Sequence, residues 1–591
     1  MGARMTHGPR EKPAAGGPSR LWKAATAAFA VTWLAALMRW WPMTRYTAWG
    51  SDSGEYAGLI ETFLATGGRL PEAYSGWGGG YPDFGGMYIF AGTFASMTGI
   101  DSFLVLSVVV PAAAALSALF AFVVALRLSR SIFAAAVAGG IVATAMPEVF
   151  AGSHGMPGAL GGMMAAAMLA AVVLSVRTPA LRWAVAVIAL ALVPTHHLSA
   201  FLAASMLAAA ALLEARFAPA DLERSRAVDA ALLGAGSLLL LSGLFWSGGA
   251  PQFRAVVLDP TSPWIGRLLP GASILGVVGL VVLAWYFETR PRDLARFRQI
   301  LEDRLIWRRL TYAAAATAAA VALLSVAGVP GTSAVVPVAL VLPFAPLGFT
   351  LAAVAAGPGR LIPVRGSLIL LGAALGVAVS GLVGLVFLPA VLIPYRHLQY
   401  FVVAAAPIAA VALAFAARSV SSSALPARRT LSRAFAAVLV SSLLAACAVT
   451  AFPSKQALVG FEEGTLDDEA AAALWLSWNI PTTLVASDHR LSSVVFGFSR
   501  QDATWEAAAP ILVGGPAVAL PALDSVRSPS GAAGVTVVLL SDDVIAGAAL
   551  SQWAPATPIQ GEAFSKFFGP PFVRAFDNGD AVAYWVVRLP V

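Results

Sequence analysis

The sequence has little charge and almost no cysteine. Only 12% of its 591 residues are charged, whereas 59% are hydrophobic and the mean hydropathy is +0.78. Soluble globular domains usually carry about 25% charged residues, so that class is excluded. The single cysteine, Cys447, cannot form a disulfide within one chain, so every domain must rely on its own core. What the sequence has instead is long apolar runs, which predict an α-helical polytopic membrane protein.

About thirteen apolar runs have the length of membrane spans or half-spans. Lys and Arg collect mainly in alternate loops, which by the positive-inside rule places the N-terminus in the cytoplasm of a multi-pass plasma-membrane protein. We therefore expect a cytoplasmic tail over residues 1–20, a transmembrane domain over 21–451 and, after an odd number of spans, an extracytoplasmic domain over 452–591. The runs lie near residues 21–43, 103–126, 131–147, 158–176, 183–194, 198–213, 227–247, 268–287, 311–328, 333–355, 367–390, 398–417 and 434–451.

The basic isoelectric point, near 9.7, comes from loops between the apolar runs. Residues 288–310 carry seven Arg among four acidic residues, an alternation typical of a cytoplasmic surface helix, so no nucleic-acid partner is expected. Residues 452–591 contain 7 basic and 14 acidic residues, and their helix, strand and hairpin signals predict a small α/β domain. These signals lie at 467–478 for the helix, 482–486 and 535–540 for buried strands, and 575–587 for the hairpin.

The first outer loop, residues 44–100, begins with the acidic and aromatic run Ser-Asp-Ser-Gly-Glu-Tyr, which contains Asp52 and Glu55. Carboxylates there would lie at the outer face of the bilayer, where a lipid-linked substrate and an acceptor can meet. Apolar residues at helical spacing from Tyr56 predict a helix lying flat on the outer leaflet and stopped by Gly67-Gly68. Asp52 followed by Glu55 three residues later also fits a capping box, so a local structural role stays open beside a catalytic one.

Aromatic side chains follow in a glycine-rich part of the same loop. Trp77 and Tyr81 stand among glycines that turn the chain. Either ring could stack on a sugar or belong to the interfacial aromatic belt, and the pattern does not decide between these roles.

A histidine pair lies between two short apolar runs. Thr195-His196-His197 follows a run of about twelve residues and precedes one of about sixteen, which predicts a shallow hairpin entering from the cytoplasm, with the pair at membrane depth. Polar groups at that depth are costly without a partner. Contact with a substrate or phosphate, structural hydrogen bonding and metal coordination all remain open. His154, in a small outer loop, is a third histidine on the outer side.

Arginine at the outer face departs from the positive-inside trend. Arg396, with His397 beside it, precedes a late apolar run, and its guanidinium could hold a lipid phosphate with two hydrogen bonds or serve as an interfacial anchor. Arg39, at the outer end of the first run, is a lesser candidate of the same kind. Asp488-His489-Arg490 follows the first strand of the α/β domain; we interpret it as a polar loop, with acceptor recognition or a partner contact as the alternative.

The order of these features resembles the GT-C superfamily of membrane glycosyltransferases. The resemblance rests on the early acidic residue, the amphipathic helix, Gly80-Tyr81-Pro82, the short helices around Thr195-His196-His197, the late Arg396 and the exported C-terminal domain. It implies an inverting transfer from a polyprenyl-phosphate or diphosphate sugar, with Asp52 aligned to the first-loop acid and Arg396 to the late outer arginine. Trp475–Asn479 is not the Trp-Trp-Asp motif of oligosaccharyltransferases, which argues against Asn glycosylation.

A transferase of this type must hold the lipid phosphate, exclude water and remove a proton from the acceptor hydroxyl. The expected partners are a polyprenyl-phosphate-linked sugar, membrane lipid and an acceptor that is a glycan, lipid or protein. No cofactor is certain, and a divalent cation, Mg²⁺ or Mn²⁺, is possible. A lipid-linked glycan polymerase or ligase is a close alternative, and a transporter or flippase is less favoured because the sequence shows no internal repeat. The residues expected to act are Asp52 and Glu55 in catalysis, Arg396, His397, His196, His197 and Arg39 at the donor phosphate, and Tyr56, Trp77, Tyr81 and His154 at the sugar or acceptor.

Overall fold

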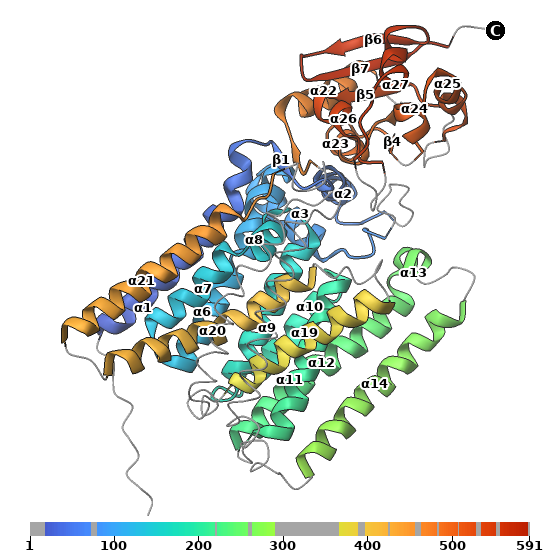
Figure 1. Cartoon of the computed structure of the whole chain (residues 1–591). Coiled ribbons are helices and arrows are strands. Elements are labelled where there is room, and N and C mark those ends of the chain that lie inside the picture. The colour runs from blue at the N-terminus through green and yellow to red at the C-terminus, as the bar shows by residue number, and fades with distance from the viewer. Residues whose placement is uncertain are drawn as a thin grey trace, which may run out of the picture.

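Helices form the body of the protein, and an α/β domain follows at its C-terminal end (Figure 1). In the computed structural model, seven described helical segments are long and apolar enough to cross a membrane. The count is eight if α7 and α8, which are bent by 56° at one break, form a single span. The structure describes residues 18–71, 80–218, 222–257, 263–289, 366–387, 396–422, 426–454, 462–480, 484–505, 507–527, 534–550 and 556–588.

The expected apolar runs within these residues all form helices, so the prediction of about thirteen spans is confirmed in part. The runs at 311–328 and 333–355 lie outside the described residues. Residues 198–213 are not half of a shallow hairpin, because α11 has 21 residues and is long enough to cross a membrane. The helices are α1 (Pro18–Trp40), α4 to α6 (Ser102–Ser129, with a π-helical turn), α7 (Ile132–Thr144), α8 (Met146–Ser153), α9 (Pro157–Ser175), α10 (Leu181–Leu192), α11 (His197–Phe217), α12 (Leu222–Gly248), α13 (Pro251–Val257), α14 (Pro263–Thr289), α19 (Ser367–Phe387), α20 (His397–Ser422) and α21 (Pro426–Val449).

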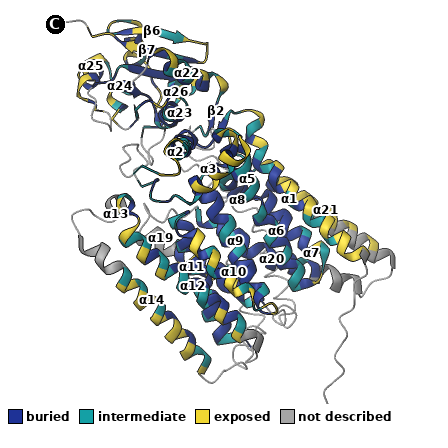
Figure 2. Cartoon of the chain, turned by 180° about the vertical axis from the view of Figure 1, so that it is seen from behind, coloured by how far each residue is buried: buried dark blue, intermediate teal, exposed yellow. Residues whose placement is uncertain are grey.

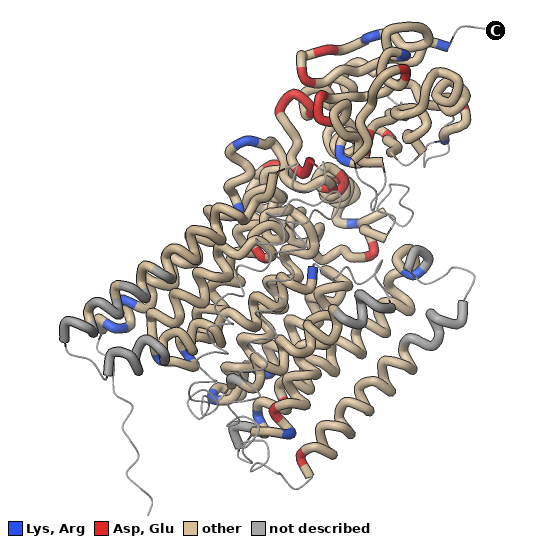
Figure 3. The backbone as a smooth tube through the Cα atoms, viewed as in Figure 1, with Lys and Arg blue, Asp and Glu red and all other residues tan. Residues whose placement is uncertain are grey.

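The helices pack closely because small residues line their contacts. A Cβ atom added at Gly376 in α19 would lie 2.3 Å from the carbonyl oxygen of Ser205 in α11, so the two backbones touch. Buried residues concentrate along α6, α7, α9, α11 and α20 (Figure 2). Figure 3 shows many acidic residues in and near the C-terminal domain and most basic residues of the helical body toward its far end, the distribution expected if that far end faces the cytoplasm.

Two helices of the first outer loop, α2 (Ser53–Ala65) and α3 (Gly86–Thr98), lie between the helical body and the C-terminal domain. The helix predicted from Tyr56 is present, and Gly67 and Gly68 follow it with φ of 69° and 97°, which stops the helix. It does not lie flat with one face open. Its first eight residues are buried, because α3 covers one side and the C-terminal domain covers another.

The C-terminal domain, whose described residues lie between 462 and 588 with four gaps, has in them a five-stranded sheet of order β4-β3-β5-β7-β6. The first three strands are parallel, and β7 pairs antiparallel with both β5 and β6. All five residues of β5 are buried, in keeping with the apolar side chains of its first four residues. The expected helix, strands and hairpin are α22 (Asp467–Asn479), β3 (Val485–Ala486), β5 (Val537–Ser541), and β6 (Phe572–Asp577) with β7 (Ala581–Val586); they are joined by α23 (His489–Ser499), β4 (Ala503–Thr504), α24 (Ala509–Val513), α25 (Pro516–Ser525), α26 (Asp542–Ala546) and α27 (Glu562–Ser565).

A two-stranded sheet ties this domain to the first outer loop. β1 (Ala48–Trp49), which lies shortly before Asp52 in the chain, pairs antiparallel with β2 (Gly464–Thr465). The pairing fixes the start of the loop against a segment that lies hundreds of residues later in the sequence.

Candidate functional site

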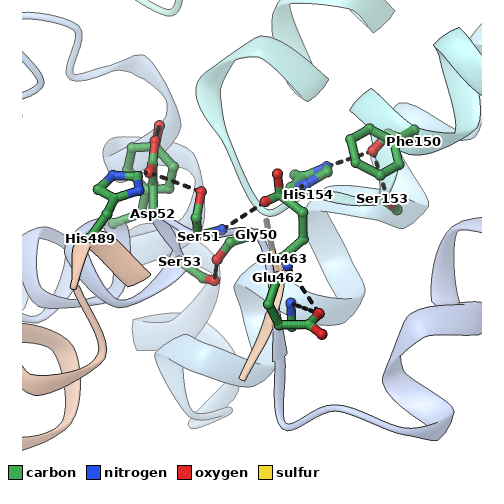
Figure 4. A network of polar contacts seen from close by, with 12 residues as sticks. Gly50, Ser51, Asp52, Ser53, Phe150, Ser153, His154, Glu462, Glu463 and His489 are labelled. Carbon is green, nitrogen blue, oxygen red and sulfur yellow. Dashed lines mark hydrogen bonds and ion pairs between the residues drawn. The ribbon is translucent and has the colours of Figure 1, made fainter. Parts of the chain in front are cut away.

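Asp52 lies at the centre of a polar cluster where the first outer loop meets the C-terminal domain (Figure 4). The hydroxyls of Tyr81 and Tyr56 donate to its Oδ2 at 2.9 and 3.3 Å. Its Oδ1 accepts from Ser51 Oγ at 3.4 Å and lies 3.4 Å from Nε2 of His489. About a quarter of the Asp52 side chain is exposed, so a substrate can reach the carboxylate.

The capping-box interpretation of this segment is wrong. Asp52 occupies the position before α2, but its side chain accepts no hydrogen bond from the backbone N–H groups of the first turn of that helix. The backbone N–H of Glu55 donates instead to Ser493 Oγ of the C-terminal domain at 3.0 Å. Glu55 is only 1% exposed, which leaves no surface for a substrate, so Asp52 is the one of the two predicted catalytic carboxylates that a substrate can contact.

His489 reaches Asp52 because α23 begins at this residue. Asp488 caps the helix, with its Oδ1 accepting from the backbone N–H of Leu491 at 3.0 Å and its Oδ2 accepting from that of Ala549 at 3.2 Å. The imidazole of His489 also packs on the ring of Trp505, with centroids 4.6 Å apart. The polar loop predicted from Asp488-His489-Arg490 is therefore a helix start that points into the candidate site.

Two glycines let α23 lie directly against α2. A Cβ atom at Gly497 would come within 2.5 Å of the carbonyl oxygen of Gly54, so the two helix backbones are in contact. Arg500 extends the interface, since it pairs with Glu61 at 3.3 Å and donates to the Gly58 carbonyl at 3.2 Å. Arg490, in the first turn of α23, forms a buried ion pair with Glu469 in α22, which fixes the start of α23 against α22.

His154 takes part in a second link between the loop and the C-terminal domain. Glu463 Oε2 accepts from the backbone N–H of Ser51 at 3.1 Å and lies 3.4 Å from His154 Nε2. The other ring nitrogen of His154 contacts the carbonyl of Phe150 at 2.5 Å. Both ring nitrogens are thus engaged and the residue is 8% exposed, so His154 links the loop to the C-terminal domain, and its contact with sugar or acceptor stays a prediction (Figure 4).

The electrostatics of the cluster favour an ionised carboxylate. Burial alone would raise the pKa of Asp52, but the hydrogen bond and charge of His489, the hydroxyl of Tyr81 and the charge of Arg396 outweigh it, so this pKa is lowered. Burial alone would lower the pKa of His489, but Asp52 and the nearby Asp488 and Glu463 outweigh it, so this pKa is raised. Both shifts thus favour an ion pair between the Asp52 carboxylate and a protonated His489.

The residues predicted to bind the phosphate of the sugar donor divide into two groups. Arg396 lies next to α20, and its charge acts on Asp52, Tyr56 and His196, which places these residues in one electrostatic neighbourhood. Arg39 lies elsewhere: it is fully buried and pairs with Glu148 at 3.2 Å, which leaves no surface for a lipid phosphate.

His397 also differs from the prediction of a phosphate contact. It is 4% exposed, and its Nε2 lies 3.2 Å from Ser380 Oγ in α19. This geometry fits a hydrogen bond between two helices. Trp77, the remaining predicted sugar contact, lies outside the described residues.

The histidine pair is arranged as a helix start. His196 caps α11, with Nδ1 3.3 Å from the backbone nitrogen of Ser199 and 2.7 Å from its Oγ. The same Oγ lies 2.5 Å from the hydroxyl of Tyr400 in α20. The ring of His197 packs between Phe84 and Phe253, with centroid distances of 5.0 and 4.6 Å. Structural hydrogen bonding, one of the three interpretations of the pair, is thus present for His196.

The described residues do not assemble a metal site. Across the parts of the chain that the structure describes, no group of three or more His, Cys, Asp or Glu side chains has the arrangement needed to hold a metal ion. The possible Mg²⁺ or Mn²⁺ therefore finds no fitting set of ligands among them.

Comparisons with known proteins identify the fold. No protein-family model and no curated protein matches the sequence. The structure is similar to an oligosaccharyltransferase of Archaeoglobus fulgidus in its apo form, with a TM-score of 0.57 and 14% identity over 88% of this chain and 69% of that chain. It is also similar to the archaeal oligosaccharyltransferase AglB from A. fulgidus in complex with an inhibitory peptide and a dolichol-phosphate, with a TM-score of 0.54 and 15% identity over 88% of this chain and 70% of that one.

A further similar structure is ArnT from Cupriavidus metallidurans bound to undecaprenyl phosphate. It has a TM-score of 0.40 and 14% identity over 96% of this chain and 98% of that chain. At these identities, the scores of the two archaeal structures show a common fold and leave the activity to be argued from the site.

Proposed function

We propose that this chain, whose fold is that of the GT-C superfamily of membrane glycosyltransferases, transfers a sugar from a polyprenyl-phosphate or diphosphate donor to an acceptor at the extracytoplasmic face. The observation that carries the proposal is the Asp52 carboxylate, which is ionised, partly exposed and held between the first outer loop and the C-terminal domain. The similar AglB structure is described in complex with a dolichol-phosphate, a lipid phosphate of the kind that the proposed transfer would release.

Asp52 acts as the general base through Oδ1 in this proposal. Two tyrosine hydroxyls engage Oδ2 at 2.9 and 3.3 Å, whereas both contacts to Oδ1 are long, at 3.4 Å, so Oδ1 keeps capacity for an acceptor hydroxyl. The acceptor O–H bond breaks and its proton passes to Oδ1 as the oxygen attacks C1 of the sugar. The bond between C1 and the phosphate oxygen breaks at the same time, and the lipid phosphate leaves with the electron pair. Attack opposite the leaving group inverts the anomeric carbon.

Arg396 stabilises the leaving phosphate in the same scheme. Its charge acts on the Asp52 neighbourhood, and a guanidinium matches the oxygens of a phosphate with two parallel hydrogen bonds. In this scheme Asp52 acts on the acceptor, and Arg396 acts on the donor.

The experiment that tests this function compares wild type with Asp52→Asn and Arg396→Gln. Each purified protein is placed in nanodiscs and offered a panel of labelled polyprenyl-phosphate sugars, and transfer, hydrolysis and donor binding are measured. A positioned base contributes about 10²- to 10⁴-fold in rate, so Asp52→Asn should lose turnover by that factor and keep donor binding. Arg396→Gln should lose donor binding as well as turnover.

The outcomes separate the functional classes. A fully active Asp52→Asn protein would refute the proposed base. Donor binding without turnover across the panel, unchanged by the substitution, would favour a flippase. Turnover that appears only when a second lipid-linked glycan is added would identify a polymerase or ligase.

A further inference from the structure

We propose that His489, supplied by the C-terminal domain, is a positioning residue for Asp52: it holds and orients the carboxylate, so the site is complete only while this domain is docked. The proposal rests on the proposed function, because it assigns His489 a part in the same transfer. No bond to the substrate is assigned to His489. It acts through Asp52 Oδ1, which it faces at 3.4 Å.

The imidazole is held in place by contacts on several sides. Its ring packs on Trp505, and the backbone N–H of His489 donates to the carbonyl of Ala549 at 2.9 Å. Only 14% of the side chain is exposed. A side chain fixed in this way pays little additional conformational entropy when it binds the carboxylate, so the contact can set the direction of Asp52.

Charges from four separate segments surround the pair. Asp488, the neighbour of His489, and Glu463, which precedes β2, both favour the imidazolium form of His489 together with Asp52. On the carboxylate side, Tyr56 and Tyr81 donate hydrogen bonds, and Arg396 adds a positive charge from beside α20. His489 is the titratable cation within 3.4 Å of Asp52, whereas the charge of Arg396 acts on Asp52 from a separate segment.

The signs of the two shifts define a pH profile. The pKa of Asp52 is lowered, so its carboxylate is lost only when the pH falls below its ordinary range, and activity falls on that acid limb. The pKa of His489 is raised, so the imidazolium is lost only when the pH rises above the ordinary histidine range, and activity falls on that alkaline limb. A lowered pKa makes the ionised Asp52 carboxylate a weaker base. It also keeps Asp52 ionised to lower pH, and a protonated carboxyl cannot accept a proton at all.

The test is the pH dependence of transfer by the full-length protein in nanodiscs, with His489→Gln and His489→Lys beside wild type. His489→Gln removes the cation, so the acid limb should move to higher pH, the alkaline limb should disappear, and kcat should fall by about 10- to 100-fold. His489→Lys restores a cation, so it should return the acid limb toward the wild-type position and keep activity to higher pH than wild type. Recovery in His489→Lys would show that the loss in His489→Gln comes from the missing cation and not from poor folding.

Arg500→Gln is the matched control. Arg500 belongs to the same interface of α23 with α2, but it contacts Glu61 and Gly58 rather than Asp52. A general loosening of the interface would lower the activity of both variants, whereas removal of the cation that faces Asp52 moves the limbs in His489→Gln alone. Arg500→Gln should therefore keep both limbs where wild type has them.

Two results would overturn the role of His489 and are distinguishable from failure of the proposed function. If Asp52→Asn abolishes transfer while His489→Gln keeps the wild-type profile, the function stands and the positioning role is wrong. If His489→Gln and His489→Lys lose activity equally without any shift of the acid limb, the residue is structural only. If Asp52→Asn is fully active, the proposed base is wrong and the role of His489 is refuted with it.

Discussion

Replacing Gly497 with Ala tests whether the docking of α23 on α2 controls the reaction. Gly497 lies inside α23, where Ala is favoured over Gly by about 1 kcal/mol, so the helix itself gains stability. The added Cβ, however, would come 2.5 Å from the Gly54 carbonyl oxygen and 2.6 Å from its Cα. These are backbone atoms, which cannot rotate away as a flexible side chain can.

The size of the effect follows from these distances. Ordinary van der Waals contact begins at 3.4 Å, so α2 and α23 must move apart by about 1 Å at this point. Asp52 directly precedes α2, and His489 is the first residue of α23, so the shift separates the two charged groups. A misplacement of about 1 Å can cost about 10²-fold in rate. We therefore expect Gly497→Ala to lower kcat by about 100-fold while the C-terminal domain stays folded.

The assay measures sugar transfer and thermal unfolding of the full-length protein in nanodiscs. The matched control is Gly569→Ala in the same domain, because Gly569 has an extended backbone and a Cβ there would meet nothing within 4 Å among the described residues. The control should transfer sugar at the wild-type rate. Wild-type turnover by Gly497→Ala would refute the reasoning, because the steric conflict with Gly54 would then have no consequence for the site.

Two further substitutions probe the supports of the site. Arg490→Ala leaves Glu469 buried without its cation, since the two side chains are 3% and 0% exposed, so the free energy of unfolding should fall by about 3–5 kcal/mol in a denaturant titration; a loss below about 1 kcal/mol would contradict this. Tyr81→Phe removes the 2.9 Å donor to Asp52 Oδ2, so the pKa of Asp52 should rise and the acid limb of the transfer profile should move to higher pH, with the alkaline limb unchanged. An unmoved acid limb would show that Tyr81 does not support the ionised form.

The helical body could be predicted from sequence because membrane helices depend on local composition. Every expected apolar run within the described residues forms a helix, and α2 ends at Ala65, just before the Gly67-Gly68 pair that predicts its end. The lengths were less accurate. The span of α11 begins at His197 and extends past 213, since its last turns carry Glu214 and Arg216, which an apolar-run criterion excludes.

The candidate site could be predicted only where its residues lie close together in the sequence. Asp52 and Tyr56 stand in one acidic and aromatic run, and Tyr81 follows in the same loop, so they could be singled out together. His489 could be placed only at the end of a strand, where its neighbours suggested a polar loop. Its contact with Asp52 depends on the approach of α2 to α23 through Gly54 and Gly497, which no local pattern reveals.

The same limit explains the residues whose predicted roles changed. Arg39 looked like a phosphate ligand because it ends the first apolar run, but its charge is matched by Glu148 from a later helix. The place of His154 on the outer side predicts a substrate contact, but its Nε2 faces the carboxylate of Glu463 from the C-terminal segment. In each case the partner is distant in sequence, and the partner decides whether a polar group is free to act.

The division of the cluster between two domains makes the pKa of Asp52 depend on docking. Asp52 lies at the N-terminus of α2, and its ion pair with His489 brings it to the N-terminus of α23 as well. A helix N-terminus carries about half a positive charge, so a dipole from each domain favours the carboxylate. Undocking would remove one dipole, the imidazolium and the bond from Ser51 to Glu463 together. After undocking, the pKa of Asp52 would be higher, so its carboxylate would be a stronger base but would be less ionised at acid pH and less well oriented. A docked C-terminal domain therefore favours the reaction only if orientation and ionisation matter more than intrinsic basicity. The pH profile of His489→Lys measures this balance.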